Sequence, residues 1–237
     1  SESSFNPLFR FEGALLPDPR VARFDPADQE TWTYSSNASL ALVRYLIHPW
    51  PNTRLVDPVT EIDWDRVAEA ADIDDRWCGR MEGELARLER NHTADGVILS
   101  TDDPLETVKA MLTACDGILV NNRGKYYPVP GARRDPVMTI HQDMIAGAFE
   151  FQSEVPDRNQ INIIKTEMVA PDREYNVVVG PVLRRDDFIA SDGQPLETTL
   201  SLPLTVGNAR AQRLASRKLF EVRSARSLTM VLTIEAR

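Results

Sequence analysis

Cys115 and Asp116 stand side by side in TACDGILVNNRGKYYPVPG (residues 113–131), where they could supply a nucleophile and a carboxylate. A nucleophilic cysteine needs a base, usually histidine, and a setting that lowers the thiol pKa, such as a helix N-terminus. The preceding segment instead predicts a helix that ends at Cys115, where the helix dipole disfavours a thiolate. Helix periodicity also places Cys115 on the apolar face. We therefore interpret Cys115 as a buried core residue and expect the chain to turn after it.

The three histidines, His48, His92 and His141, fall in three separate segments and lack the spacing of paired metal ligands. We therefore expect no zinc or iron site. The acidic run at residues 72–75 resembles part of a calcium loop, but the glycine and the distal glutamate of such a loop are missing. This run predicts a solvated helix end.

Other charged residues have simple structural interpretations. Asp102 and Asp103 could form an acid–base pair, but their place before Pro104 favours a helix cap. The basic pairs 133–134 and 184–185 have aspartates nearby, which predicts surface ion pairs. Phosphate-binding glycine motifs and the nucleophile motif GxSxG do not occur. The sequence thus predicts no catalytic, cofactor-binding or metal-binding residues and favours a protein that is not an enzyme.

Composition narrows the class of protein further. The chain has 237 residues with a formal net charge of −9, which argues against a nucleic-acid binder because phosphate contacts need clustered Lys and Arg. No apolar run approaches the roughly 20 residues that span a bilayer. Two cysteines do not make a disulfide framework, so a reducing compartment is favoured. Because Met does not open the chain and a strand-like segment closes it, we expect an excerpt of a longer polypeptide.

Four segments have the apolar spacing and end signals of amphipathic helices. Ser36 or Asn37 precedes the first as N-cap, and Asp63 precedes the second. Pro104 opens the third and Gly117 lies just beyond its last turn. The predicted helices are residues 37–48, 63–76, 104–116 and 208–223.

The same spacing predicts which residues of two helices are buried. The third helix is expected to bury Leu105, Val108, Met111, Leu112 and Cys115. The fourth is expected to bury Ala209, Leu214 and either Leu219 or Phe220.

Alternation and turn residues predict the strands. Residues 117–129 read as a hairpin that turns at NNRG, and residues 159–170, 196–204 and 227–236 alternate as strands. Residues 84–100 are ambiguous between a helix and a hairpin centred near residue 95. The whole pattern predicts an α+β fold of two mixed subdomains, in which amphipathic helices pack on β-hairpins and small sheets. We divide the chain into an irregular segment 1–30, a helix-rich subdomain 31–150 and a β-rich subdomain 151–237 with one helix.

The order of several stretches resembles one family. The chain is similar to the central tail-tip hub of long-tailed phages, the lambda-like host-specificity (J) protein family, and to the related hubs of gene-transfer agents. The resemblance covers residues 31–237, and residues 81–86 depart from the family's usual length. The five stretches are SSNASLALVRYLIHP, IDWDRVAEAADIDD, PLETVKAMLTACDGILVNNRGKYYPVPG, RNQINIIKTEMVAPDREYN and DGQPLETTLSLPLTVGNARAQRLASRKL.

The resemblance implies a structural role in the virion. Such hubs form a homotrimeric ring, in the full-length protein, that closes the distal end of the tail tube. They contact distal tail proteins, other tip proteins and the tape-measure protein, support host attachment, and let genomic DNA pass without binding it specifically. The resemblance implies no catalytic residue, cofactor or metal, and assembly in the bacterial host cytoplasm. We expect this segment alone to be monomeric or weakly associating.

Two other classes of protein remain as alternatives. A cell-wall-degrading tail enzyme would need Cys115, Asp116 or His141 to share a pocket. A receptor-binding module would expose aromatic clusters on loops, whereas the tryptophans of this chain lie beside segments that look core-forming. These tryptophans are Trp32, Trp50, Trp64 and Trp77. Within the hub interpretation, the acids at 72–75, 102–103 and 184–187 either face a DNA channel or serve solubility alone.

Overall fold

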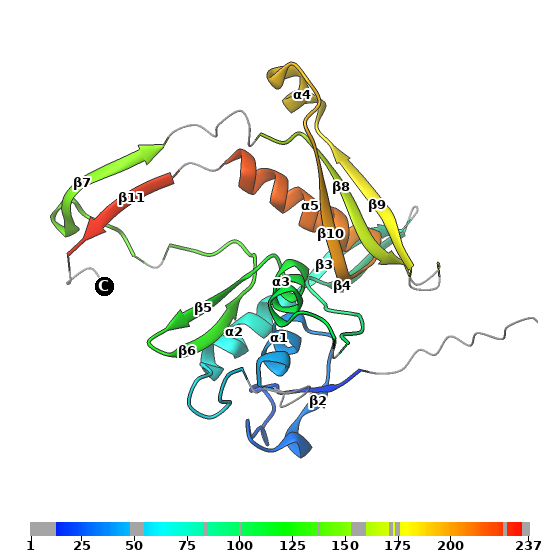
Figure 1. The fold of residues 1–237 in the computed structure, drawn as a ribbon, viewed down its shortest axis with the longest axis vertical. Coiled ribbons are helices and arrows are strands. Elements are labelled where there is room, and N and C mark those ends of the chain that lie inside the picture. The colour runs from blue at the N-terminus through cyan, green and yellow to red at the C-terminus, as the bar shows by residue number, and fades with distance from the viewer. Residues whose placement is uncertain are drawn as a thin grey trace, which may run out of the picture.

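The protein was analysed as a computed structural model that describes residues 13–47, 55–82, 85–99, 101–136, 138–152, 160–170, 173, 176–224 and 227–233. Its elements confirm the α+β class (Figure 1). The helices are α1 Ala38–Ile47, α2 Trp64–Asp74, α3 Pro104–Ala114, α4 Asp186–Asp192 and α5 Asn208–Arg223, with short 3-10 turns at Gln29–Thr31 and Gln142–Met144. His48 and Trp50 lie outside the described residues.

The strands form several small sheets. Antiparallel pairs join β1 to β2, β3 to β4, β5 to β6 and β7 to β11, while a three-stranded sheet has the order β10-β8-β9. Within that sheet β10 runs parallel to β8 and β9 antiparallel to it. The bounds are β1 Leu15–Leu16, β2 Thr33–Tyr34, β3 Trp77–Glu82, β4 Leu85–Arg90, β5 Ile118–Asn122, β6 Lys125–Val129, β7 Ile145–Gln152, β8 Ile163–Ala170, β9 Asn176–Arg184, β10 Glu197–Val206 and β11 Ser227–Leu232.

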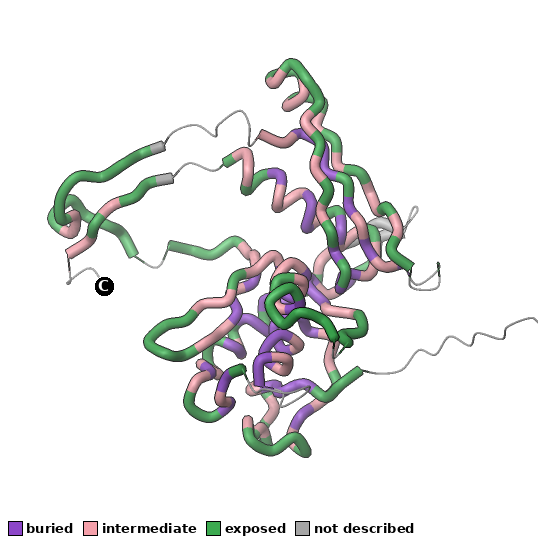
Figure 2. Tube along the Cα trace, in the orientation of Figure 1, coloured by how far each residue is buried: buried purple, intermediate pink, exposed green. Residues whose placement is uncertain are grey.

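The largest core surrounds α1, whose Leu40, Leu42 and Val43 are completely buried. Helices α2 and α3 and strand β6 pack around it (Figure 2). The Asn37 side chain begins α1 by accepting a hydrogen bond from the Leu40 amide, and it also donates to the Ala71 carbonyl of α2. One predicted N-cap residue therefore both starts a helix and ties it to its neighbour.

A second apolar region lies between α5 and the face of the three-stranded sheet that it covers. There Leu214, Ala215 and Leu219 of α5 pack on residues of β8 and β10. The predicted helix 208–223 is confirmed, and Leu219 is the buried member of the pair with Phe220. Ala211 is buried, whereas the predicted Ala209 is only partly buried. Ala211 lies three and four residues before Leu214 and Ala215, so it shares their buried face of α5.

The third predicted helix is confirmed together with its cap. Asp103 accepts hydrogen bonds from the amides of Leu105 and Glu106, and Pro104 occupies the first turn. The helix ends in a Schellman motif in which Asp116, at φ +49°, takes the left-handed conformation and the Gly117 amide reaches the Leu112 carbonyl.

The predicted apolar face of α3 is wrong at its start. Leu105 is exposed, because the first turn of α3 projects beyond the core, and Thr107 is buried instead. The predicted hairpin at 117–129 is confirmed as β5–β6, with Arg123 and Gly124 both at positive φ as a two-residue type I′ turn requires.

The prediction around residue 95 is wrong. Residues 85–90 form β4, which pairs with the preceding strand β3 and not with a strand after residue 95. Residues 97–99 are not in a strand. The segment after β4 instead joins distant elements, because the Ala94 amide donates to the Ser36 carbonyl and the Asp95 amide to the Leu204 carbonyl of β10. Strands β7 and β9 and helix α4 were not predicted.

Two predictions about tryptophan and the acidic run also fail. Trp77 is exposed, since it lies on the open β3–β4 hairpin where the Arg90 guanidinium stacks on its ring. Trp32 is buried and Trp64 is partly buried, as expected. The run at 72–75 is not simply a solvated helix end, because Asp74 is completely buried.

The division into subdomains stays a prediction. The proposed boundary near residue 150 falls inside β7, which pairs with β11 at Ser227–Leu232. Leu204 of β10 also packs into the core around α1. The two halves of the chain are therefore linked by both an apolar contact and a β-ribbon.

Candidate functional site

A row of arginines on α5 meets the segment that follows β4. Arg210, Arg213 and Arg217 recur at helical spacing and so lie on one face. Arg213 pairs with the buried Glu89 carboxylate at 2.6 Å. Arg210 donates to the Thr93 hydroxyl and to the carbonyl of Val206, the last residue of β10. We call this contact the arginine seam: the three α5 arginines against residues 89–95.

At the end of the seam, Arg217 donates hydrogen bonds to three residues in two segments, the one after β4 and the one after β6. Its guanidinium donates to Nε2 of His92, to the Gly131 carbonyl oxygen at 2.8 Å and to Asn91 Oδ1 at 3.2 Å. A guanidinium can only donate hydrogen bonds, so Nε2 of His92 must be an acceptor. The His92 proton therefore resides on Nδ1, and the ring is neutral.

The other ring nitrogen of His92 is hydrogen-bonded to Asp74 of α2. Nδ1 of His92 lies 2.7 Å from Asp74 Oδ1, and Asp74 Oδ2 accepts a hydrogen bond from the Ser39 amide at 2.8 Å. The exposed fractions of His92 and Asp74 are 1% and 0%. Ser39, Asp74 and His92 are buried, and Arg217 is partly exposed. Successive hydrogen bonds through these four residues join α1, α2 and α5, and we call them the buried polar chain.

A carboxylate that orients a histidine also occurs in nucleophilic active sites. In such sites Nε2 of the histidine faces a nucleophile and then a substrate. Here Nε2 of His92 accepts from Arg217 instead, and the ring is closed off from solvent. This arrangement of hydrogen bonds holds three helices together.

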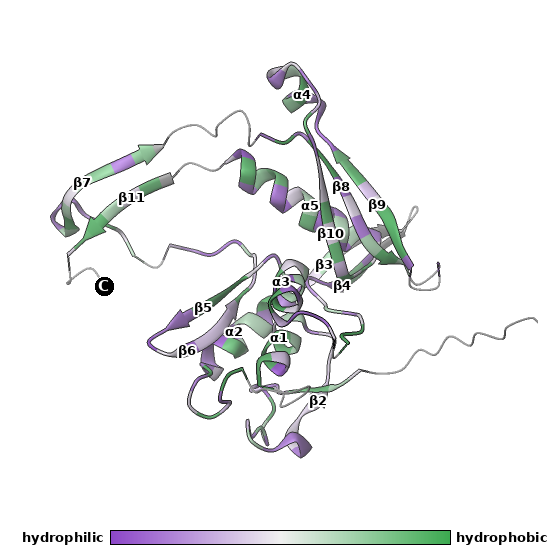
Figure 3. Ribbon diagram, viewed as in Figure 1, coloured by the Kyte–Doolittle hydropathy of each residue, from purple (hydrophilic) through white to green (hydrophobic). Residues whose placement is uncertain are grey.

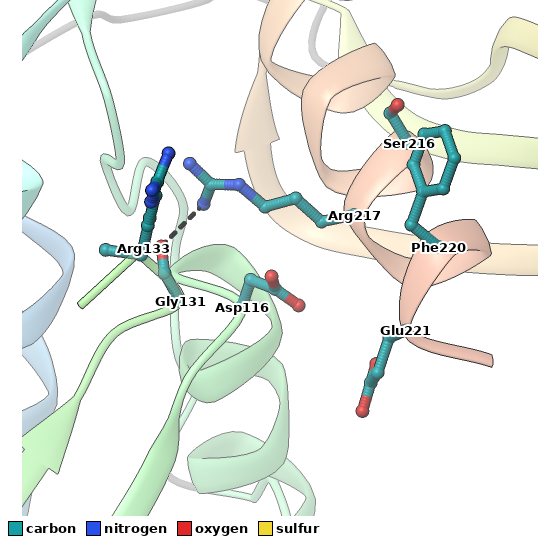
Figure 4. A pocket seen from close by; sticks show the side chains of 8 residues that line it. Asp116, Gly131, Arg133, Ser216, Arg217, Phe220 and Glu221 are labelled. Carbon is teal, nitrogen blue, oxygen red and sulfur yellow. Dashed lines mark hydrogen bonds between the residues drawn. The ribbon is translucent and has the colours of Figure 1, made fainter. Parts of the chain in front are cut away.

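Next to the buried polar chain lies an open cleft of about 460 Å³ between α5 and the end of α3 (Figure 4). Burial raises the pKa of the Asp116 carboxyl there, and the Arg217 guanidinium opposes the rise. A side chain on Gly131 would meet the oxygens of Asp116 at 2.5 Å, so glycine allows this close approach. The lining residues are Asp116, Gly131, Ala132, Arg133, Ser216, Arg217, Phe220 and Glu221.

Cys115 does not line this cleft. It is completely buried, its Sγ donates to the Leu112 carbonyl at 3.4 Å, and burial raises the pKa of the thiol. His141 is exposed beside β7. Of the three residues that an enzyme would have to bring together, the cleft contains Asp116 alone.

The remaining charged candidates have local partners. Asp103 caps α3, and Asp102 accepts from the Leu99 amide. Arg184 and Arg185 pair with Asp186 and Asp187, which confirms the predicted surface ion pairs there. Within the described residues the 133–134 pair makes no ion pair, and Arg133 lines the cleft instead.

Sequence reasoning missed Asp74, His92 and Arg217 as a unit. One signal was available for Asp74: it falls seven residues after Val67 and three after Ala71, on the buried face of α2. A charged residue at an apolar position needs a partner, because an unpaired buried charge is costly. No local pattern marks His92 and Arg217, which lie far apart in the sequence.

The fold and site together define an α+β protein whose halves are held by a buried polar chain. A scan against protein-family models and a search of curated proteins each found no match for this chain. No group of three or more His, Cys, Asp and Glu in the described part of the chain could hold a metal ion. None of the helices described is long and apolar enough to cross a membrane.

We expect native Cys115 to resist thiol reagents, because burial raises the pKa of the thiol and keeps reagents out. Cys78, which is partly exposed, provides an internal control. Peptide mapping after a short alkylation at pH 8 should find Cys78 modified and Cys115 unmodified, and both modified in denaturant. Cys115→Ala should lower the free energy of unfolding by about 1–2 kcal/mol, and Cys115→Asp should prevent folding. Rapid, complete labelling of native Cys115 would contradict its assignment to the core.

Asp116→Asn should stabilise the protein at pH 7. Because the folded state raises the carboxyl pKa, the ionised form opposes folding, and the helix C-terminus disfavours the negative charge. We expect a gain of about 0.3–1 kcal/mol at neutral pH that disappears as the pH falls below about 4, where Asp116 is protonated in both states. Denaturant titrations of both proteins at pH 7 and pH 3 measure this. Asp116→Ala is the matched variant and should not stabilise, since alanine is unfavourable at positive φ.

Proposed function

We propose that this chain is a structural component of a phage tail-tip hub, which closes the distal tail tube, organises neighbouring tip proteins and supports host attachment and DNA passage. In this proposal the chain is not an enzyme, and it acts in the virion tail tip after assembly in the bacterial host. The full-length protein forms a homotrimer that contacts distal tail, tip and tape-measure proteins.

The observation that carries the proposal is the ordered run of five sequence stretches. They correspond to α1, to α2, to α3 with β5 and β6, to β8, and to β10 with α5. These elements contribute both apolar regions and the arginine seam, so the resemblance involves the framework of the fold rather than its surface loops. A framework role agrees with a site whose buried histidine and acid hold helices together.

Immunogold labelling of tailed particles tests the proposal directly. Antibodies raised against the purified chain are applied to particles from the organism that encodes it, with antibody pre-adsorbed on the same chain as control. Label at the distal tip of the tail is the expected result. Particles that lack label, or label along the tail shaft or on the capsid, would reject the proposal. Release of soluble peptidoglycan fragments by the purified chain would favour the cell-wall enzyme instead.

The contacts of the acidic residues reduce the number of candidates for a channel wall that faces DNA. Asp74 is buried, and Asp72 and Asp75 pair with Arg20, so the 72–75 run serves the fold. Asp102, Asp103, Asp186 and Asp187 are exposed and remain as candidates for a negative channel wall, which would repel DNA over about 8 Å at physiological salt. Arg184 and Arg185 pair with Asp186 and Asp187 and partly offset the charge of these two acids. Asp186→Lys/Asp187→Lys particles should eject DNA more slowly than wild type at low salt and equally fast at high salt. Equal rates at both would assign these acids to solubility.

A further inference from the structure

The open cleft between α5 and the end of α3 contains a carboxylate without a hydrogen-bond donor. Asp116 is partly buried, and its side chain points toward α5 (Figure 4). Burial is the main cause that raises its carboxyl pKa, and the other causes are the charges of nearby groups. Within the described residues the Asp116 side chain has neither a hydrogen bond nor an ion pair. Such a carboxylate has given up part of its hydration without gaining a donor.

The buried acids elsewhere in the described chain do have donors. Each lies against an arginine or histidine side chain at hydrogen-bond distance, as expected because an unpaired buried charge is costly. The pairs are Asp18 with Arg20, Asp74 with His92, and Glu89 with Arg213. The carboxylate of Asp116 therefore differs from these in lacking a partner within the fold.

The positive side chains near the cleft are engaged elsewhere or point away. Arg217 donates its hydrogen bonds to the segments after β4 and β6, and Figure 4 shows the bond to the Gly131 carbonyl. Lys218 pairs with an acid one turn along its own helix. The Arg133 side chain points away from Asp116 (Figure 4). Since none of these described cations forms an ion pair with Asp116, its charge is open to a partner from outside.

The negative charge of Asp116 also opposes the local structure. Asp116 follows the C-terminal end of α3, where the helix dipole disfavours an anion, and burial disfavours the charge further. Asparagine would keep the left-handed turn without that charge. A charged residue that costs stability and has no compensating contact in the fold marks a candidate binding site.

We propose that the cleft binds a positively charged nitrogen group, an alkylammonium or a guanidinium, which donates hydrogen bonds to the Asp116 carboxylate. A charge-assisted hydrogen bond is roughly twice as strong as a neutral one and supplies the missing donor. Glu221 lines the same cleft and adds a second negative charge. Phe220, which is 45% exposed, offers apolar surface to the carbon stem of such a group. Helix α5, which carries both residues, alternates hydrophobic and hydrophilic residues along its length (Figure 3).

A free polyamine and a lysine or arginine side chain of another polypeptide share this chemistry. Both present a cation at the end of an apolar stem, so the cleft would recognise the same part of each. Such binding is separate from the proposed tail-tip role and depends on Asp116 and the cleft alone.

NMR titration of the 237-residue chain tests the site. The probes are spermidine and capped Ala-Lys-Ala, Ala-Arg-Ala and neutral Ala-Gln-Ala peptides, each added up to about 20 mM. About 150 mM salt screens nonspecific attraction to the acidic surface. The amides of Asp116, Gly117 and Gly131 should shift and saturate with cationic probes and stay unchanged with the neutral peptide. Asp116→Asn should bind the same cations at least about tenfold more weakly, because the charged acceptor is gone.

The two sources are distinguished by which probes saturate the site. Saturation by spermidine alone assigns a free amine, and saturation by the peptides alone assigns a side chain of a polypeptide. Saturation by both shows that the charged group and its stem suffice.

The matched control is Glu69→Gln, which removes an exposed negative charge from α2 outside the cleft and should bind like wild type. Three results would overturn the proposal: no saturation by any cationic probe, equal shifts with the neutral peptide, or unchanged affinity in Asp116→Asn. If that variant does not fold by circular dichroism, carbon NMR of the wild-type Asp116 carboxyl decides. A saturating cation must lower the pH at which this carboxyl titrates, because it binds the ionised form, and an unchanged titration rejects the site.

Discussion

Asp74→Ala is expected to lower the free energy of unfolding by about 2–6 kcal/mol, from about 1–3 kcal/mol for each of two buried donors left without an acceptor. Asp74 is completely buried and accepts from the Ser39 amide and from His92 Nδ1. Alanine leaves both donors without their acceptor in a site that water does not reach, and an unmade buried hydrogen bond costs the full desolvation of the group. Chemical denaturation monitored by tryptophan fluorescence measures the loss.

Glu69→Ala is the matched control for this prediction. Glu69 lies on the same helix, but it is exposed, and its ion pair is with Arg66 one turn away. We expect a change within about 0.5 kcal/mol, as for most surface substitutions. If Asp74→Ala lowered the free energy of unfolding as little as Glu69→Ala, the buried polar chain would contribute little to stability and would not hold the helices together.

Arg213→Ala/Arg217→Ala should uncouple the two halves of the fold. The substitutions remove the 2.6 Å pair with Glu89 and the contacts to His92 and Gly131. Arg213 is partly exposed, and Glu89 keeps a longer contact with Arg210, so we expect a loss of about 1.5–3 kcal/mol for each charged hydrogen-bonding side chain removed. The cores around α1 and beside α5 are otherwise linked mainly by Leu204 and the β-segments. We therefore expect calorimetry to resolve two unfolding transitions where wild type shows one.

The matched control is Lys218→Ala, on the same helix and in an ion pair with the exposed Glu221. It should leave a single transition with nearly unchanged midpoint. A single transition in the double arginine variant, shifted or not, would show that the apolar contact at Leu204 alone keeps the halves cooperative.

Much of the local structure could be predicted because it depends on neighbouring residues. Asp103 and Pro104 start α3 by a side-chain cap and a preset φ, whatever packs around them. Arg123 and Gly124 form the turn of the β5–β6 hairpin for the same kind of reason. The burial of Cys115 also followed from the position of one residue in a helical repeat.

Helix spacing was insufficient where burial depends on distant contacts. Leu105 has the spacing of a core residue, yet it is exposed, because among the described residues no element covers its side of the first turn of α3. Residues 85–90 have helical composition and form a strand, since the backbone of β3 is available for pairing. Strand β9 was missed because it becomes a strand by pairing with β8, and its Gly180 and Pro181 weaken the local signal.

By itself, the sequence determined the α+β class, the positions of the capped helices and the absence of a local nucleophile motif, because each depends on spacing within one segment. The tertiary structure alone decided that Asp74, His92 and Arg217 meet. His92 and Arg217 are 125 residues apart in the chain, and their contact depends on how α5 docks against the segment after β4. Burial then gives that contact its strength, because hydrogen bonds between charged and polar groups count for most where water is excluded.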